Sequence, residues 1–323
     1  MNTPRPNASG IPTGDTTAVP EKAPIATGGT PATALKTSSP LPAQHDERPV
    51  RFDYSPAELE EKARVLRRHI INITGRAGSG HPGGSLSAAD IVAALYFKVL
   101  RHNPSDPKWR ERDRFILSKG HAAPLLYAAL AEGGYFPVQE LETVRQINSR
   151  LQGHADKTVT PGVEMSSGSL GQGISFGIGA ALAARLDSLP YRVYVLLGDG
   201  ECDEGQVWEA AMAAAHFKMD NLTAIVDRNE IQLDGWTEEI MNLEPFADKW
   251  RAFGWNVVEI NGHSISEILD AFEKAKSFQG RPSVIIAHTV KGKGVSFMEN
   301  NPEFHGKAPN PEQVKLALKE LEK

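Results

Sequence analysis

The chain has 323 residues, of which 40% are hydrophobic and 23% charged, and its formal net charge is −5. This composition is typical of a globular protein, and mild acidity without a basic stripe argues against nucleic acid as the main partner. No apolar run reaches the roughly 18 residues that a membrane-spanning helix needs. The single cysteine, Cys202, excludes an internal disulfide and fits a reducing compartment, so we expect a cytoplasmic protein.

Residues 1–48 are rich in Pro, Thr, Ala and Gly and carry almost no large apolar side chains. Such a segment buries too little apolar surface to offset the entropy lost on ordering, so the sequence predicts a disordered tail. A processed targeting peptide is the alternative, but Asp15 and Glu21 among few arginines argue against it. The folded domain is expected over residues 49–323, as one large domain rather than two.

Two helices are predicted at the start of this domain. Ser55-Pro56-Ala57-Glu58 forms a capping box with proline at the first helical position. Apolar residues then recur at helical spacing, which predicts a helix that ends near Gly75. A second helix is expected to begin at Ser87, with Asp90 in its first turn. The loop between them carries Ser79-Gly80-His81-Pro82.

Short apolar runs bounded by turn residues recur along the rest of the chain, with helical stretches between them. They lack strict alternation, which is typical of strands buried on both faces of a parallel sheet. The sequence therefore predicts a doubly wound α/β fold with a mostly parallel sheet, whose ligands bind at the carboxyl ends of the strands. The expected strands are residues 115–117, 191–197, 222–226, 255–260 and 284–287, and the expected helices are residues 205–217, 245–253, 264–277 and 311–323, with a second capping box at Ser264 and Glu267.

Polar motifs directly follow two of the expected strands. Gly198-Asp199-Gly200 comes after residues 191–197, and Asn229 comes shortly after residues 222–226. A diphosphate group is commonly bound through a hard divalent cation, for which carboxylate and amide oxygens are suitable ligands. Gly-Asp-Gly alone is also a common tight turn, but Asn229 at a second strand end favours the metal-binding interpretation.

With Asp199 and Asn229 each placed after an apolar run, the chain resembles the transketolases, which depend on thiamine diphosphate. The resemblance covers residues 57–309 and implies a thiamine diphosphate-binding domain of the PP type, the type that holds the diphosphate of the cofactor. Several independent motifs in one order are not expected by chance. The motifs that stand in the family's order are Ser79-Gly80-His81-Pro82, Ser118-Lys119-Gly120-His121, Gly153-His154, Gly168-Ser169-Leu170-Gly171-Gln172-Gly173, Gly198-Asp199-Gly200 and His305-Gly306-Lys307.

The resemblance implies roles for individual residues. The implied metal ligands are Asp199, Asn229 and the backbone carbonyl of Ile231, with Mg²⁺ as the expected ion and Ca²⁺ or Mn²⁺ as alternatives. The implied cofactor-binding residues are His121, Gly168, Ser169, Leu170, Gly200, Asn229, Lys291 and His305. His81, His154 and His305 are expected to face the substrate, because imidazoles titrate near the working pH and suit proton transfer.

Other polar residues have a structural interpretation beside the functional one. Acidic residues near a helix start are favourable in any protein. By resemblance, however, Glu204 and Glu209 form a carboxylate link between two active sites at a subunit interface. Cys202 is not expected to be a nucleophile, because acidic neighbours disfavour the thiolate. The histidines interpreted as structural are His69, His102, His216, His263 and His288.

The implied reaction transfers a two-carbon ketol unit from a ketose phosphate to an aldose phosphate, as in the pentose phosphate pathway. Complete members of the family continue into a pyrimidine-binding domain, whose glutamate activates the cofactor, and this sequence ends before such a domain. We therefore expect a partner chain, a C-terminal transketolase subunit that supplies this domain, in an assembly of two copies of each chain.

Two alternatives stay open. The chain could belong to another thiamine-dependent ketol-forming enzyme, such as one similar to deoxyxylulose-phosphate synthase or a specialised sugar transketolase. His154 and His305 favour transketolase. The other alternative is a non-catalytic cofactor-binding remnant, against which the intact histidines and metal ligands argue. Gly84 and Leu233 depart from the family's pattern, which leaves the finer contacts of the cofactor open.

Overall fold

In the computed structural model residues 52–322 are described, so the predicted tail and its boundary at residue 48 lie outside the described residues. The described chain is built on a five-stranded sheet with the strand order β1-β2-β3-β5-β4, and all neighbouring strands are parallel. The predicted parallel α/β fold is confirmed. The strands are β1 (Arg114–Leu117), β2 (Val193–Gly198), β3 (Leu222–Arg228), β4 (Asn256–Asn261) and β5 (Ser283–His288).

The position of each strand in the sheet explains its sequence. β2 and β3 lie in the interior and are buried at every position, which accounts for their continuous apolar runs. β4 lies at the edge and is only partly buried, and its residues are correspondingly more polar. Each strand begins and ends within two residues of its predicted bounds.

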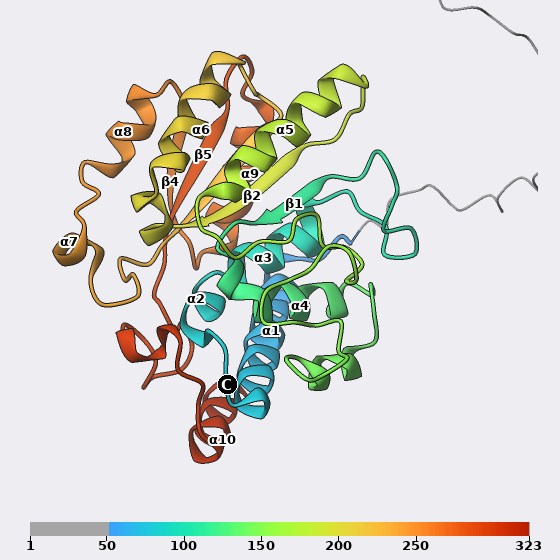
Figure 1. Ribbon diagram of the computed structural model, residues 1–323, viewed down its shortest axis with the longest axis vertical. Coiled ribbons are helices and arrows are strands. Elements are labelled where there is room, and N and C mark those ends of the chain that lie inside the picture. Colours follow the sequence, from blue (N-terminus) through green and yellow to red (C-terminus); the bar gives the residue numbers. More distant parts are fainter. Residues whose placement is uncertain (1–51, 323) are drawn as a thin grey trace, which may run out of the picture. The chain divides into compact units, whose positions relative to one another are not determined.

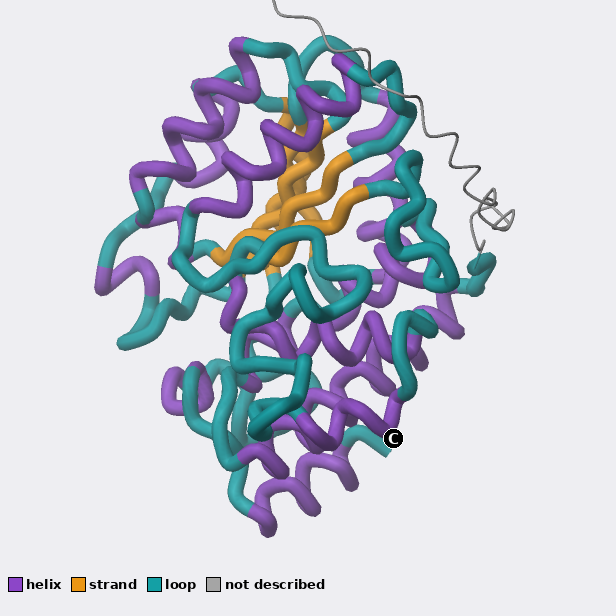
Figure 2. Tube along the Cα trace, turned by 45° about the vertical axis from the view of Figure 1, so that its right-hand side comes forward, coloured by secondary structure: helices purple, strands orange, loops and turns teal. Residues whose placement is uncertain are grey.

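Helices cover both faces of the sheet (Figures 1 and 2). Each helical layer packs its own apolar core against the sheet. One layer contains α1 (Pro56–Ala77), α3 (Ala89–Ala94), α4 (Ala123–Glu132) and α9 (Ile265–Ser277), and the other contains α5 (Gln172–Leu186), α6 (Gly205–His216) and α8 (Phe246–Ala252). Short helices complete the described chain: α2 (Pro82–Ser87), η1 (Leu95–Val99), η2 (Gly120–Ala122), η3 (Val138–Thr143), η4 (Gly200–Asp203), α7 (Thr237–Ile240), η5 (Pro302–His305) and α10 (Pro311–Glu320). None of the described helices is both long enough and apolar enough to cross a membrane.

The predicted capping box of α1 is confirmed. Ser55 Oγ accepts a hydrogen bond from Glu58 N at 3.4 Å, and the Glu58 carboxylate accepts one from Ser55 N at 2.7 Å. The helix continues slightly beyond the predicted end at Gly75, to Ala77. It ends at Gly78, whose φ of 60° is the left-handed conformation that glycine adopts without strain.

Two local details differ from the prediction. The helix expected to begin at Ser87 begins two residues later as α3, with Asp90 in its first turn as predicted, and α2, in which Pro82 takes the favourable first position, was not predicted. The second capping box is only half formed. Ser264 Oγ accepts from Glu267 N, but the Glu267 carboxylate accepts from Asn261 N at 2.8 Å instead of from Ser264 N.

Candidate functional site

The motif residues gather at the carboxyl ends of the strands. β1 leads into residues 118–121, β2 into Asp199, β3 into Asn229 and β5 into residues 289–291. β2, β3 and β5 are parallel neighbours in the sheet, so the segments that follow them meet at one edge. This is the edge at which open α/β sheets bind ligands.

A cavity of about 290 Å³ opens between these segments. A larger cavity of about 720 Å³ lies elsewhere, against α1 and α10, and contains none of the motif residues. Gly84, Lys119 and Glu201 also line the smaller cavity. Nine predicted site residues line it: His121, Leu170, Asp199, Gly200, Glu204, Asn229, Ile231, Lys291 and His305. The predicted residues outside its lining are His81, His154, Gly168, Ser169 and Glu209.

Asp199 is buried and held by backbone hydrogen bonds. Its Oδ1 accepts from Gly200 N at 2.9 Å and its Oδ2 from Glu230 N at 2.5 Å. Burial, together with the negative charge of Asp227, raises the pKa of Asp199 to about 6. A cation beside this carboxylate would favour its ionised form, so the site fits a metal ion electrostatically.

The donor set favours a hard cation bound partly by an anionic ligand. Asp199, Asn229 and Ile231 line the same cavity and carry a carboxylate, a side-chain amide and a backbone carbonyl. Among the described residues, no group of three His, Cys, Asp or Glu side chains is placed to hold a metal ion. An ion here would use one carboxylate, one amide and one carbonyl, with the oxygens of a bound diphosphate completing its shell.

Lys291 connects the metal-ligand candidates with a histidine. Its buried Nζ donates to the Ile231 carbonyl at 2.6 Å and lies 2.9 Å from His305 Nδ1. Burial lowers the pKa of Lys291 to about 8, so it remains mostly an ammonium at neutral pH. An ammonium only donates, so Nδ1 is the accepting nitrogen of His305 and the ring proton lies on Nε2.

Three imidazoles form a cluster at the cavity. The ring centroids of His81, His121 and His305 lie 5.1–5.5 Å apart. Burial is the largest cause of a lowered pKa in all three, and nearby cations such as Lys291 and Lys119 lower it further. The pKa of His305 falls to about 3. The three rings are therefore neutral at neutral pH, a state in which each can both donate and accept a hydrogen bond.

His154 and Gly168 lie together near this cluster. A Cβ placed on Gly168 would be 3.4 Å from His154 Cδ2, and both residues are exposed. Arg145 donates to Ser79 Oγ at 3.1 Å, and its charge adds to burial in lowering the pKa of both His81 and His154. Among the described residues the buried Nδ1 of His81 has no hydrogen-bond partner, so this atom could bind a ligand.

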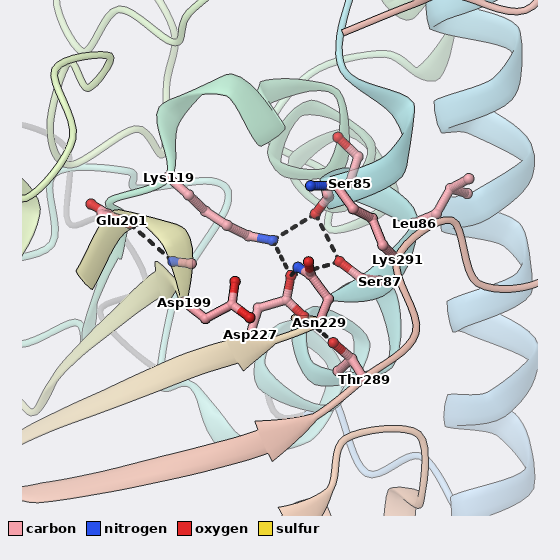
Figure 3. A network of polar contacts seen from close by, with 12 residues as sticks. Ser85, Leu86, Ser87, Lys119, Asp199, Glu201, Asp227, Asn229, Thr289 and Lys291 are labelled. Carbon is pink, nitrogen blue, oxygen red and sulfur yellow. Dashed lines mark hydrogen bonds and ion pairs between the residues drawn. The ribbon is translucent and has the colours of Figure 1, made fainter. Parts of the chain in front are cut away.

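A buried ion pair that sequence reasoning missed adjoins the cavity, which Lys119 lines (Figure 3). Lys119 Nζ is 2.5 Å from Asp227 Oδ2, and the two side chains are 1% and 0% exposed. Asp227 also accepts from Ser87 at 2.6 Å, Thr289 at 2.5 Å and Asn229 at 2.9 Å. Burial alone would raise the pKa of Asp227, but the Lys119 ammonium and these hydrogen bonds hold it below its ordinary value. Two signals were available in the sequence, namely a lysine inside the Ser-Lys-Gly-His motif and an acidic residue within an apolar strand.

Glu201 was also missed. Its buried carboxylate accepts from Ser118 Oγ, from Gly171 N at 2.9 Å and from Gly198 N at 3.0 Å. These donors belong to the segment that carries His121, to the glycine-rich loop of residues 168–173 and to the segment that carries Asp199. Burial raises the pKa of Glu201, and its hydrogen bonds oppose that shift. Glu201 thus connects three walls of the site.

Besides His154 and Gly168, three further predicted residues lie on the surface. Ser169, Glu204 and Glu209 are exposed, and Glu204 also borders the cavity. Cys202, by contrast, is buried and donates to the Gly198 carbonyl at 3.4 Å. Burial and acidic neighbours raise the pKa of its thiol well above the ordinary value, which agrees with the expectation that it is not a nucleophile.

The histidines interpreted as structural lie apart from the cavity lining. Three of them have hydrogen-bond partners in the chain: His69 with Glu132, His102 with the Tyr96 carbonyl and His263 with Asp90. His216 and His288 are exposed. These hydrogen bonds support the structural interpretation for His69, His102 and His263, whereas for His216 and His288 it stays a prediction.

Known proteins resemble this chain over most of its length. A family model described as "Transketolase, thiamine diphosphate binding domain" matches residues 58–322. A 6-deoxy-6-sulfo-D-fructose transketolase subunit of Clostridium sp. (strain MSTE9) is 49% identical over 82% of this chain and 97% of its own length. An apulose-4-phosphate transketolase subunit of Phocaeicola vulgatus is 43% identical over 81% of this chain and 93% of its own.

Solved structures share the fold. Transketolase from Leishmania mexicana matches with a TM-score of 0.79 and 33% identity, over 82% of this chain and 41% of that one. Transketolase from Campylobacter jejuni matches with the same TM-score and 36% identity, over 83% and 43%. The chain thus spans less than half of these two proteins, but nearly all of the two subunits above.

Proposed function

The chain belongs to the transketolase family, in which it matches the thiamine diphosphate binding domain, and on this basis we propose that it is the cofactor-binding subunit of a two-chain transketolase. The observation that carries the proposal is the convergence of Asp199, Asn229, Ile231, Lys291 and His305 on one cavity at the strand ends. A partner chain is supported by relatives that are named as subunits and are matched over nearly their full length.

We propose that Asp199, Asn229 and the Ile231 carbonyl hold Mg²⁺, which in turn binds the diphosphate. Gly200 is a further proposed cofactor contact, and a Cβ there would lie 2.6 Å from Gln232 Cβ, so the turn after Asp199 favours glycine. Thiamine diphosphate, when bound, supplies the electron sink for cleavage of the carbon–carbon bond beside a ketose carbonyl. The other proposed cofactor contacts are His121, Gly168, Ser169, Leu170, Lys291 and His305.

The histidines are proposed to position the sugar and move protons. With Nδ1 bound by Lys291, His305 has its Nε2–H to donate to a substrate or cofactor oxygen. Neutral His81 has an unpartnered Nδ1 among the described residues, and exposed His154 lies beside the glycine-rich loop. Neutral imidazoles of this kind can exchange protons with sugar hydroxyls near neutral pH.

We propose a specialised sugar as the physiological donor. The relatives named above act, by their names, on 6-deoxy-6-sulfo-D-fructose and on apulose 4-phosphate. Both names describe sugars with an anionic group, as the ketose phosphates of the pentose phosphate pathway also have. A role in that pathway and a cytoplasmic location remain predictions.

The assembly is proposed to contain two copies of each chain, with Glu204 and Glu209 near the contact between the copies of this one. The exposed side of α5 supports a contact between two copies, because Phe176, Gly179 and Ala183 continue toward Leu186 as a stripe of uncharged residues on that helix. Lys157 Nζ lies beside this stripe, 5.7 Å from the Phe176 ring. A two-fold axis between Gly179 and Ala183 would bring Phe176 of one copy toward Leu186 of the other. The stripe is therefore self-complementary, as a two-fold interface requires.

The activity assay uses the full chain with the chain that copurifies with it. The two are incubated with thiamine diphosphate, Mg²⁺ and ribose 5-phosphate as acceptor, and the donors compared are xylulose 5-phosphate, 6-deoxy-6-sulfo-D-fructose and apulose 4-phosphate. Two-carbon transfer from one of these donors supports the proposal, and the preferred donor identifies the substrate class. Transfer by this chain alone would contradict the proposal that two chains are required. If the complex binds the cofactor but transfers a two-carbon unit from none of these donors, the proposal that it is a transketolase enzyme is contradicted.

A further inference from the structure

The side-chain amide of Asn229 can present either of its ends to a bound ion, and only its oxygen binds a cation. In the structure Asn229 Nδ2 donates to Asp227 Oδ2 at 2.9 Å, and Oδ1 accepts from Ile231 N at 3.2 Å. An ionised carboxylate only accepts hydrogen bonds, so the amide must turn its NH₂ group toward Asp227. The opposite rotamer would place the Asn229 oxygen against the Asp227 carboxylate.

Asp227 is itself fixed by donors from three separate parts of the chain. Lys119, from the loop after β1, and Ser87, at the end of α2, both donate to Oδ2. Thr289, which follows β5, donates to Oδ1. Figure 3 shows these side chains converging on the carboxylate at the end of β3. Asp227 is fully buried, so it can neither rotate away nor exchange these donors for water.

The same contacts distinguish Asp227 from Asp199. Oδ2 of Asp227 already accepts three hydrogen bonds, and Lys119 offsets its charge. Asp199 accepts only from backbone N–H groups, has no lysine or arginine in a salt bridge with it among the described residues, and lines the cavity. The geometry therefore separates a carboxylate that faces a ligand from one that faces the protein.

We infer that Asp227 is a positioning residue, which accepts the Nδ2 hydrogen of Asn229 and thereby turns the Asn229 oxygen toward the metal ion. The inference rests on the proposed function, because it assigns Asn229 to that ion. Lys119 and Ser87 contribute to this positioning, since they hold the accepting oxygen of Asp227 in place. Outer partners of metal ligands typically change metal affinity by about 10–100-fold when they are replaced.

Two matched variants distinguish the effect of the hydrogen-bond-accepting oxygen of Asp227 from the effect of its negative charge. Asp227→Asn and Asp227→Leu both remove the negative charge at similar size, but only asparagine keeps an oxygen. Lys119 and Ser87 are donors and turn that oxygen to the position that Asp227 Oδ2 occupies. Mn²⁺ binding in the presence of thiamine diphosphate is measured by electron paramagnetic resonance, with the full chain and any chain that copurifies with it. We expect Asp227→Leu to bind Mn²⁺ at least about tenfold more weakly than Asp227→Asn.

The control replaces the amide by a ligand that needs no orientation. In an Asn229→Asp background the side chain offers an oxygen in either rotamer, so the difference between the two Asp227 variants should disappear. Thermal unfolding without metal checks that each variant folds, and Asp227→Ala replaces the leucine variant if that one does not. Equal Mn²⁺ affinities of the two variants, or a difference that persists with Asn229→Asp, would overturn the inference. A parent protein that binds neither Mn²⁺ nor the cofactor would overturn the proposed function and, with it, the inference.

Discussion

At the scale of single residues, His305 links stability to pH. Its pKa is about 3 in the folded chain, mainly through burial and the Lys291 ammonium, against an ordinary value of 6.5. Below pH 6.5 the unfolded chain therefore binds a proton that the folded chain does not, so this residue makes the free energy of unfolding decrease as pH falls toward 3. Asp199, whose pKa is raised to about 6, contributes with the opposite sign.

The variant His305→Gln isolates this contribution. We expect its free energy of unfolding to decrease less steeply than that of the parent between pH 6.5 and 4, which urea unfolding at a series of pH values measures. Both proteins contain Asp199, so its contribution to the pH dependence cancels when the two are compared. If the free energy of unfolding changes with pH equally in the parent and in His305→Gln, His305 is not held neutral in the folded chain.

His154 separates catalysis from cofactor binding. It is exposed and lies outside the lining of the cavity, beside Gly168. His154→Ala should leave the affinity for thiamine diphosphate unchanged but lower the rate of the two-chain enzyme by about 10²–10⁴, the usual contribution of positioned acid–base help. His216→Ala, at an exposed histidine on α6, is the control. A His154 variant as fast as the parent would exclude this residue from the reaction.

At this scale the sequence predicted the residues that follow strands but not their buried partners. Asp199 and Asn229 were predicted as site residues because each follows an apolar run, and the structure brings both to one cavity. Lys119 and Asp227 pair across 108 positions of the chain. No local pattern encodes such a pair, because the pairing depends on how β1 and β3 are placed in the sheet.

At the scale of elements, the site depends on the close approach of two loops. A Cβ on Gly120 would lie 2.7 Å from Gly168 N and from the carbonyl carbon of Ser167, both backbone atoms that cannot move independently. Gly120→Ala should therefore separate the loops that carry His121 and Leu170. We expect a stability loss of about 1–3 kcal/mol by denaturant unfolding, with weaker cofactor binding.

Gly205→Ala is the matched control for this substitution. No atom lies within 4 Å of a Cβ at Gly205, so the variant should keep both stability and binding. If Gly120→Ala were as stable as this control and bound the cofactor equally well, the two loops would not be constrained as described.

Regular elements were predicted well where periodicity or capping was strong. α1 and the five strands have clear patterns, whereas α2 contains Gly83 and Gly84 and shows no apolar periodicity. Its burial between other elements, rather than its helix propensity, stabilises it. The predicted end of α9 was correct, but Asn261 competes with Ser264 for the Glu267 carboxylate, a tertiary detail that the spacing does not reveal.

At the scale of the whole molecule, the parallel sheet was predictable because apolar runs alternate with helices, whereas the assembly of two copies of each chain was expected only from the family resemblance and stays a prediction. The uncharged stripe on α5 could equally have been part of a buried core, and only its exposure in the structure distinguishes these two possibilities.

Phe176→Asp would place a charge in the proposed contact between two copies. Sedimentation of the two-chain complex should then show half the parent mass, and an unchanged mass would exclude this face from the assembly.

The central claim is that Asp199 and Asn229 hold the metal ion through which thiamine diphosphate binds. Isothermal titration calorimetry with thiamine diphosphate and Mg²⁺ tests it most directly, on the parent, on Asp199→Ala and on Asp270→Ala, which removes an exposed carboxylate from α9. The parent and Asp270→Ala should bind the cofactor only when Mg²⁺ is present, and Asp199→Ala should show no binding. Unchanged affinity in Asp199→Ala, or binding by the parent that does not depend on Mg²⁺, would contradict the assignment of this site.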